Sequence, residues 1–238
     1  MSREAPEHRL ERLIDAATQA FLARGYRRTQ ISDIAKIMGV APGTVYLYVQ
    51  SKEALFDLVI RACLSDEGLS TIPVPVPTPA PGASLKLIRR TLERKGRIEA
   101  LEESVRVSAS ERQFETVLRE LFRKSVRYWL AIKLVERSAL DWPELAQAWF
   151  VRYRGKILGQ LTRYFERAIE SGILRRPPNV VAAARLVLEM NAALAIHRHL
   201  DPHPTPMDDR IAEETFVDAV LHAYGRATHK TQDQEVQS

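Results

Sequence analysis

The side chains best suited to chemistry lie between residues 42 and 52, in the stretch PGTVYLYVQSK. Thr44, Tyr46 and Tyr48 carry hydroxyl groups there, and Lys52 carries an ammonium group. Such groups donate hydrogen bonds to phosphate oxygens, and a threonine can also reach a base edge. Gly43 has no side chain, so the backbone at this position can approach a partner closely. The residue types of this segment are therefore compatible with contacts to nucleic acid.

The sequence contains no convincing pattern for a metal site or a catalytic site. His197 and His199 are two residues apart, so on a helix their side chains would point about 200° away from each other. His203 lies in the proline-rich stretch DPHPTP, so it does not share a helix face with the other two histidines. Cys63 has no evident partner base that could activate its thiol as a nucleophile. The sequence also lacks a glycine-rich phosphate loop. We therefore expect no metal, no cofactor and no catalytic residue.

Composition indicates a folded chain in a reducing compartment. The 238 residues are 45% hydrophobic, which is enough to build a core. A single cysteine excludes an internal disulfide, and the charged start MSREAPEHRLER lacks the apolar run of a signal peptide. No later run approaches the roughly 18 apolar residues of a membrane span. We expect a cytoplasmic protein without membrane contact, whose net charge of +5 is compatible with an anionic partner.

Three helices are expected up to Val49, and the third of them contains most of the segment with the hydroxyl groups. Apolar residues recur at steps of three and four over 10–21, which predicts a helix that ends at Gly25. Thr29 is expected to cap a second helix, which Gly39 ends in the left-handed conformation. A third helix is expected from about Pro42 to Val49. This order of elements is that of a helix-turn-helix.

A fourth helix and a proline-rich stretch follow. Ser51 is expected to cap this helix, which should run to about Ser65. The stretch TIPVPVPTPAPG at 71–82 contains five prolines, which remove backbone donors and favour an extended path. We interpret it as a semi-rigid connection between the fourth helix and the C-terminal part of the chain.

The stretch GVAPGTVYLYVQSKEALF at 39–56 resembles the DNA-binding region of the TetR family of bacterial transcriptional regulators. FLARGYRRTQISDIA at 21–35 resembles the end of that family's first helix and the start of its second. The resemblance implies a recognition helix that enters the major groove. Leu47 stands where a polar or aromatic residue is frequent, so specificity should lean on thymine methyl groups or DNA shape. The DNA contacts that the resemblance and the residue chemistry suggest are Arg28, Thr29, Pro42, Gly43, Thr44, Tyr46, Tyr48 and Lys52.

Helical periodicity continues beyond residue 84 without a strand signal. Pro143 fits the first turn of a long helix that Gly172 ends, and two more helices are expected at 179–199 and 209–224. The resemblance implies that this half binds a small ligand and that the last two helices pair with their copies in a homodimer. The candidate pocket residues are Phe114, Phe122, Trp129, Trp149, Tyr153, Met190, Asn191 and His197.

A basic cluster lies outside these two sites. Its cations are interspersed with Glu93 and Glu99, which is typical of a solvated helix face. Its members are Arg89, Arg90, Arg94, Lys95 and Arg97.

The sequence thus predicts an all-α fold, in which an N-terminal three-helix helix-turn-helix domain precedes a larger helical domain for ligand binding and dimerisation. We place the DNA-binding domain at 1–50, the connecting helix with the proline-rich linker at 51–83, the second domain at 84–225 and a flexible tail at 226–238. The expected function is a repressor released from a palindromic operator by a small, largely hydrophobic ligand. An all-α enzyme, or a helical binding protein without DNA-binding activity, remains the alternative.

Overall fold

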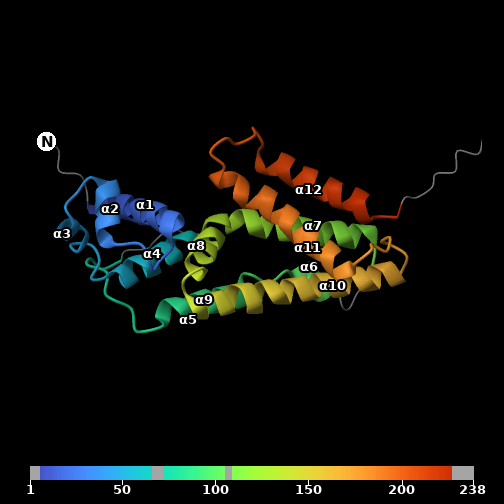
Figure 1. The fold of residues 1–238 in the computed structure, drawn as a ribbon, viewed down its shortest axis with the longest axis horizontal. Coiled ribbons are helices and arrows are strands. Elements are labelled where there is room, and N and C mark those ends of the chain that lie inside the picture. Colours follow the sequence, from blue (N-terminus) through green and yellow to red (C-terminus); the bar gives the residue numbers. More distant parts are fainter. Residues whose placement is uncertain (1–5, 66–71, 105–108, 227–238) are drawn as a thin grey trace, which may run out of the picture. The chain divides into compact units, whose positions relative to one another are not determined.

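The computed structural model describes residues 6–65, 72–104 and 109–226 (Figure 1). Over these residues the chain is helical, and its only β-pairing is two isolated bridges, Val49 with Val76 and Leu174 with Gly225. The predicted all-α fold is therefore confirmed. Apart from residue 226, the predicted tail lies outside the described residues.

The chain forms two compact units, each assembled from separate stretches of the sequence. The first unit comprises 1–97 and 124–157, and the second comprises 98–123 and 158–238. Residues 124–157 belong to the first unit because Leu134, Leu145 and Trp149 are buried in the same core as the N-terminal helices. In addition, the Tyr26 amide donates to the Ser138 hydroxyl at 3.2 Å. Helices from the middle of the chain thus complete the first unit.

Four helices begin the first unit: α1 (Pro6–Arg24), α2 (Ile31–Met38), α3 (Pro42–Val45) and α4 (Lys52–Leu64). Gly25 and Gly39 follow α1 and α2 with positive φ angles of 78° and 70°, as the sequence predicts. Ser51 caps α4 by accepting a hydrogen bond from the Ala54 amide at 3.1 Å, which is also confirmed.

The third helix is shorter than predicted, because it ends at Val45 rather than near Val49. A turn follows, and the backbone then pairs with the proline-rich stretch. The Val76 amide donates to the Tyr48 carbonyl at 2.8 Å, and the Gln50 amide donates to the Val76 carbonyl at 2.9 Å. These backbone groups are therefore not available to continue the helix.

The rest of the first unit is built from α5 (Ala83–Arg94), α8 (Trp129–Ala139), α9 (Pro143–Ala146) and η1 (Gln147–Arg154). Pro143 begins a long helical run, as predicted, but η1 within it is a π-helix. The run continues as α10 (Gly155–Glu170) and ends before Gly172, which has a φ of 74°. Helix α5 packs on η1.

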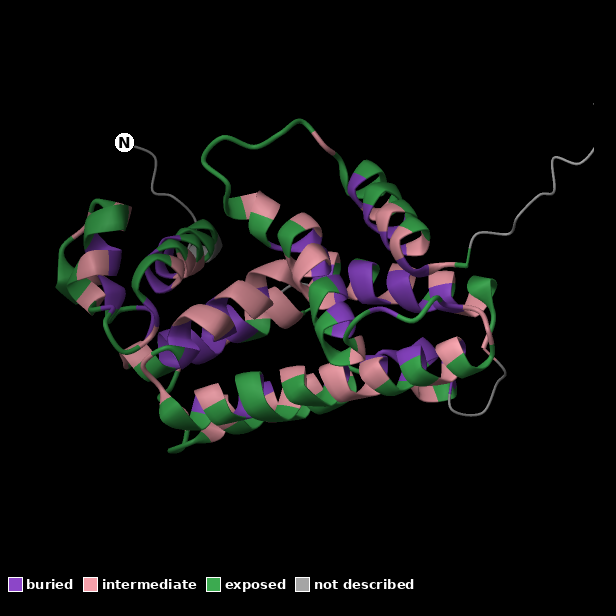
Figure 2. Ribbon diagram, turned by 45° about the vertical axis from the view of Figure 1, so that its right-hand side comes forward, coloured by how far each residue is buried: buried purple, intermediate pink, exposed green. Residues whose placement is uncertain are grey.

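The second unit contains α6 (Glu99–Glu103), most of α7 (Glu111–Arg127) and α10, α11 (Val180–Ala195), η2 (His197–Leu200) and α12 (Asp209–Tyr224). The helix predicted at 179–199 is thus divided into α11 and a short 3-10 turn. Asn179 and Asp208 cap α11 and α12 through their side chains. Helices α11 and α12 pack together, and Figure 2 shows their buried and exposed faces.

Candidate nucleic-acid interface

Residues 41–48, which we call the recognition segment, lie at the surface of the first unit. Ala41, Pro42 and Gly43 are exposed, and a Cβ atom added at Gly43 would meet nothing within 4 Å. Tyr46 is 50% exposed and Leu47 is 66% exposed. These residues are accessible from solvent because α3 packs through one buried side chain, Val45.

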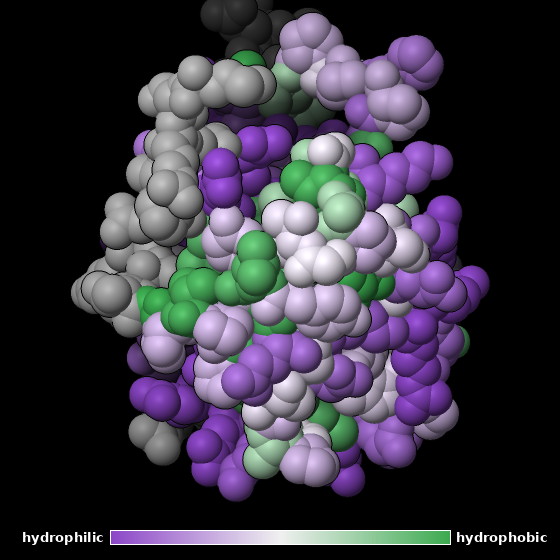
Figure 3. Space-filling view, turned by 90° about the vertical axis from the view of Figure 1, so that its left-hand side faces the viewer, coloured by the Kyte–Doolittle hydropathy of each residue, from purple (hydrophilic) through white to green (hydrophobic). Residues whose placement is uncertain are grey.

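The face of the first unit that carries this segment mixes polar with hydrophobic side chains. Figure 3 views it directly, and hydrophobic groups stand out among hydrophilic ones. Ile37 on α2 is 46% exposed, and Leu47 is more exposed still. Exposed aliphatic groups beside Thr44 and Tyr46 suit contact with base edges and thymine methyl groups.

Thr29 does not lie where we expected it. The residue is fully buried, and its hydroxyl donates toward the carbonyl oxygens of Gly25 at 2.7 Å and Ala20 at 3.2 Å. The N-cap of α2 is Gln30, which forms a capping box with Asp33. The predicted cap was therefore wrong, because the Thr29 hydroxyl pairs with the end of α1 instead. That hydroxyl is not available to a phosphate.

Tyr48 also differs from its expected exposed position. Only 9% of the residue is exposed, and it belongs to the core of the first unit. Its backbone carbonyl accepts the hydrogen bond from Val76. Of the two tyrosines of the recognition segment, Tyr46 is therefore the one that faces solvent.

The two cations predicted to contact DNA, Arg28 and Lys52, have partners within the protein. Lys52 is the first residue of α4, as predicted, and its ammonium group donates to the backbone carbonyls of Arg27 at 3.2 Å and Thr29 at 2.9 Å. The same group lies 4.8 Å from the centre of the Tyr26 ring. Arg28 forms an ion pair with Asp141, with an Nε to Oδ2 distance of 2.8 Å. Lys52 thus fixes the backbone that leads into α2.

A tyrosine and a glutamate complete this network. The Tyr26 hydroxyl donates to Glu53 Oε1 at 2.8 Å, and the Tyr26 ring lies 4.6 Å from that of Phe56. This hydrogen bond is the main cause that lowers the pKa of Glu53. Burial, followed by the same hydrogen bond, raises the pKa of Tyr26. The network connects the end of α1 to the start of α4.

The proline-rich stretch is a part of this region that the sequence interpretation missed. Its prolines at 75, 77 and 79 leave Val76 and Thr78 as backbone donors between them, and both are used. Thr78 donates its amide to Gln50 Oε1 at 3.1 Å, and its hydroxyl donates to the Ser51 hydroxyl at 2.9 Å. The stretch therefore holds the end of the recognition segment in place through backbone hydrogen bonds, and it also connects α4 to α5. The regular alternation of proline with donor residues was the signal that could have indicated this.

The eight predicted pocket residues are not brought together by the structure. Trp129, Trp149 and Tyr153 belong to the first unit, and the other five belong to the second. Phe122 is packed against Phe216 in an ordinary core, while His197 is exposed. Among the described residues, no cavity is lined by all eight. Phe114 borders an open hollow of about 650 Å³ against α7 and α12, and Tyr153 lines a smaller cleft.

Two further kinds of feature are absent from the described part of the chain. It contains no helix that is long and apolar enough to cross a membrane. It also contains no group of three or more histidine, cysteine or acidic side chains placed to hold a metal ion.

Comparison with known proteins agrees with this geometry. Residues 13–59 match the family described as bacterial regulatory proteins, tetR family, and residues 104–226 match the C-terminal domain of AefR-like transcriptional repressors. The first of these matches contains the whole recognition segment, and the second covers more than half of the chain.

Similar individual proteins are also transcriptional regulators. The fatty acid metabolism regulator protein of Bacillus subtilis is 43% identical over 53 residues, which are 22% of this chain and 26% of that protein. The repressor KstR2 of Rhodococcus jostii is 39% identical over 54 residues, 23% of this chain and 26% of that protein. The chain thus matches about a quarter of the length of these relatives.

A solved structure extends the likeness to the whole fold. The ketosteroid transcriptional regulator KstR2 of Mycobacterium tuberculosis aligns with a TM-score of 0.54 over 94% of this chain and 97% of that one. Its sequence identity is 16%, so this likeness concerns the fold alone. Members of the matched family are DNA-binding transcription factors rather than enzymes. With a helix-turn-helix followed by a helical C-terminal domain, this chain belongs to the TetR family of transcriptional regulators.

Proposed function

We propose that this protein is a homodimeric repressor that binds a palindromic operator and is released from it by a small effector with a substantial apolar part. The exposed recognition segment, anchored by buried Val45 and supported by the proline-rich stretch, is the observation that carries this proposal. The match to AefR-like repressors supports repression, and the names of the fatty acid and ketosteroid regulators support an apolar effector.

The proposed DNA contacts are narrower than the set predicted from sequence. Pro42, Gly43, Thr44 and Tyr46 would face the major groove, and Leu47 would supply an apolar contact to a thymine methyl group. Arg28 and Lys52 would add charge near the phosphate backbone while keeping their internal partners. The buried side chains of Thr29 and Tyr48 would only hold the segment in place.

A second copy of the chain is required because one short helix covers little DNA surface, whereas two copies engage both halves of a palindrome. Helices α11 and α12 are proposed as the dimer contact. Val181 and Leu186 on α11 are each 52% exposed, and Ile211 on α12 is 43% exposed. Ala182 and Ala193 on α11 are also exposed, and their small side chains would allow close helix packing.

The test is binding to palindromic DNA fragments from the protein's own promoter region, measured by fluorescence anisotropy. We expect two protomers per fragment and an affinity whose logarithm falls linearly with the logarithm of salt concentration. Tyr46→Ala should weaken binding by about tenfold, the effect of one lost base or phosphate contact worth about 1.4 kcal/mol. Leu140→Ala is the matched control, because Leu140 is 61% exposed but lies outside the recognition segment. Folded Tyr46→Ala protein with unchanged affinity would refute the proposed interface.

A further inference from the structure

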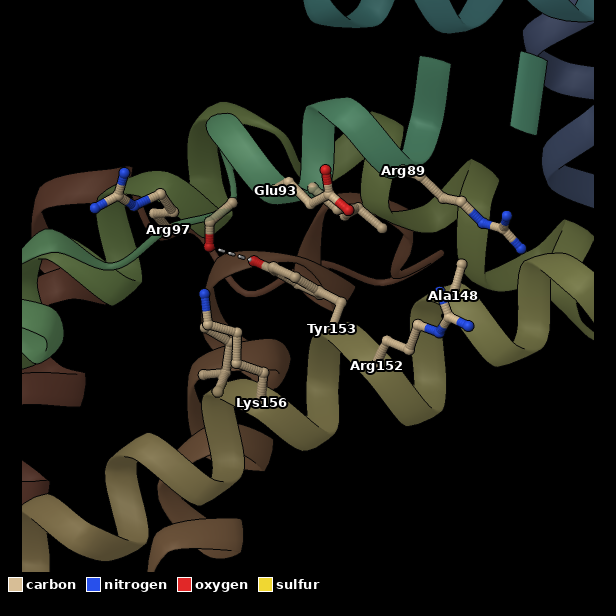
Figure 4. A pocket seen from close by; sticks show the side chains of 10 residues that line it. Arg89, Glu93, Arg97, Ala148, Arg152, Tyr153 and Lys156 are labelled. Atoms are coloured by element: carbon tan, nitrogen blue, oxygen red, sulfur yellow. Dashed lines mark hydrogen bonds between the residues drawn. The ribbon is translucent and has the colours of Figure 1, made fainter. Parts of the chain in front are cut away.

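A cleft of about 220 Å³ lies within the first unit, where α5 packs on η1 and the start of α10 (Figure 4). One wall comes from α5 and the residues after it, and the other comes from residues 148–157. We call it the basic cleft. It is lined by Arg89, Leu92, Glu93, Gly96, Arg97, Ala148, Arg152, Tyr153, Lys156 and Ile157.

Tyr153 crosses the middle of the basic cleft and is firmly held. Its hydroxyl donates to the Gly96 carbonyl at 3.1 Å, and its ring stacks on Trp149 with 5.1 Å between ring centres. The ring also lies directly against Gly96, since a Cβ atom added there would be 2.5 Å from Tyr153 Cε2. The cleft therefore has a fixed aromatic wall, beside the apolar side chains of Leu92 and Ile157.

The charge of the lining is strongly one-sided. Arg89, Arg97, Arg152 and Lys156 contribute four positive charges, and Glu93 contributes the single negative charge. In Figure 4, Arg89 and Arg152 come from the two facing helices and lie on the Ala148 side of Tyr153, whereas Arg97 and Lys156 lie on its other side. An anion in this cleft would thus meet a cation from each wall.

Neither Arg89 nor Arg152 forms an ion pair with a described residue, whereas Arg24, Arg28 and Arg61 of the same unit each do. The Nε atom of Arg89 is buried and has no hydrogen-bond partner in the described structure. An unsatisfied buried donor is costly, and more so when it is charged. An acceptor bound in the cleft would satisfy this donor.

This arrangement corrects the prediction that residues 89–97 form one solvated face. Arg90 and Arg94 are exposed and do not line the cleft. Lys95 instead donates to the Leu64 carbonyl at 2.8 Å. Of this cluster, two cations thus face solvent, Lys95 binds a backbone carbonyl, and Arg89 and Arg97 line the cleft. The charge pattern alone could not indicate these different positions.

We propose that the basic cleft binds a small anion with an apolar body, such as a medium-chain carboxylate or a phosphate monoester. Arg89 and Arg152 bind the anionic group, and Leu92, Ala148 and Ile157 contact the apolar body. The volume is below the 300–1,000 Å³ that is usual for drug-sized ligands, so the ligand is smaller than these. A neutral ligand would leave the Arg89 donor without a charged acceptor, and a cation would be repelled. That this ligand is also the effector rests on the function proposed above.

Isothermal titration calorimetry with four eight-carbon probes tests the site directly. Octanoate and octyl phosphate carry the proposed chemistry, and they separate a carboxylate from a phosphate group. Octanol and octylammonium have the same apolar body with a neutral or positive head. We expect at least one anionic probe to bind about ten times more tightly than octanol, because a charge-assisted hydrogen bond is roughly twice as strong as one between neutral groups.

Three variants locate the binding. Arg89→Ala and Arg152→Ala should each weaken binding of the preferred anion about tenfold or more. Arg90→Ala is the matched control, since Arg90 is exposed on the same helix outside the cleft, and it should stay within twofold of wild type. The proposal is overturned if neither anion exceeds octanol tenfold, if both cleft variants bind like wild type, or if Arg90→Ala loses as much as they do.

Operator release is measured separately with the same probes. If the preferred anion binds at the cleft but leaves DNA affinity unchanged, the site stands and its role as effector site in the proposed function fails. If the protein binds no palindrome at all, the calorimetric result still decides whether the basic cleft takes an anion. Failure of the site and failure of the function are thus distinguishable.

Discussion

Cations serve different roles around the recognition segment and in the basic cleft. Near the recognition segment, Lys52 donates to two backbone carbonyls and Arg28 is paired with Asp141. In the basic cleft, Arg89 and Arg152 have no ion-pair partner among the described residues. In the region with the stronger sequence signal for binding an anion, the two predicted cationic contacts thus already have partners within the protein.

The difference shows that the number of charges does not reveal their availability. Residues 1–65 carry nine Lys and Arg against seven Asp and Glu, a small excess, and the structure shows that part of it stabilises the fold. Arg24, for example, pairs with Asp33 at 2.9 Å. Binding of DNA would therefore depend on the uncharged side chains of Thr44, Tyr46 and Leu47, with phosphate attraction added to them. The basic cleft, by contrast, depends on charge.

The largest effect that this comparison predicts is at Lys52. Lys52→Met keeps the length of the side chain but removes the hydrogen bonds to the Arg27 and Thr29 carbonyls and the contact with the Tyr26 ring. We expect the free energy of unfolding to fall by about 2 kcal/mol, because hydrogen bonds from a charged group contribute about 1.5–3 kcal/mol. Urea unfolding followed by circular dichroism measures it.

Lys36→Met is the control for this experiment. Lys36 lies on α2 and is exposed. Its substitution should change the free energy of unfolding by less than about 0.5 kcal/mol. If both variants are equally stable, the lysine at the start of α4 is not a structural residue, and the contrast with the basic cleft disappears.

A smaller effect, which depends on pH, is expected at Tyr26. Because the hydrogen bond from Tyr26 lowers the pKa of Glu53 below its unfolded value, it stabilises the folded state above that value. This contribution is lost as the pH falls through the lowered pKa. Tyr26→Phe should therefore be less stable than wild type by about 0.5–1 kcal/mol near neutral pH. The expected loss is small because Glu53 is exposed, so solvent screens its charge.

The measurement is the difference in unfolding free energy between Tyr26→Phe and wild type from pH 7 down to pH 3. The difference should shrink on the acid side, where Glu53 becomes protonated in both proteins. Tyr164→Phe provides a control without a carboxylate partner, because the buried Tyr164 hydroxyl has no hydrogen-bond partner in the described structure. A Tyr26 difference that stays constant over this range would show that packing, rather than the Glu53 hydrogen bond, is responsible.

Features set by neighbouring residues could be predicted from the sequence. Gly25 and Gly39 end their helices because only glycine adopts a positive φ without strain. Ser51 directly precedes α4 and caps it by accepting from the amide of Ala54, three residues further on. The same local logic placed the recognition segment and the helices from Pro143 and Asp208 onward. The family resemblance added the expected function of these elements.

Features set by distant partners could not be predicted in this way. The Thr29 hydroxyl could have capped α2, but it donates instead to the carbonyls of Ala20 and Gly25 at the end of α1. Helix α3 ends early because Tyr48 pairs with Val76, 28 residues away in the chain. Likewise, Arg89 lines the basic cleft because α5 packs on residues some sixty positions later. Each outcome depends on tertiary contacts that no local pattern encodes.

The smallest expected effect is at the cations of the basic cleft. Arg152→Leu removes an exposed guanidinium without a described ion pair, so the free energy of unfolding should change by less than about 0.5 kcal/mol. Arg89→Leu should be neutral or slightly stabilising, since it replaces a buried donor that lacks a partner. Arg28→Leu is the comparison, and loss of its ion pair with Asp141 should cost up to about 1 kcal/mol. If the cleft variants instead lose more stability than Arg28→Leu, their cations are structural, and the two regions use charge in the same way.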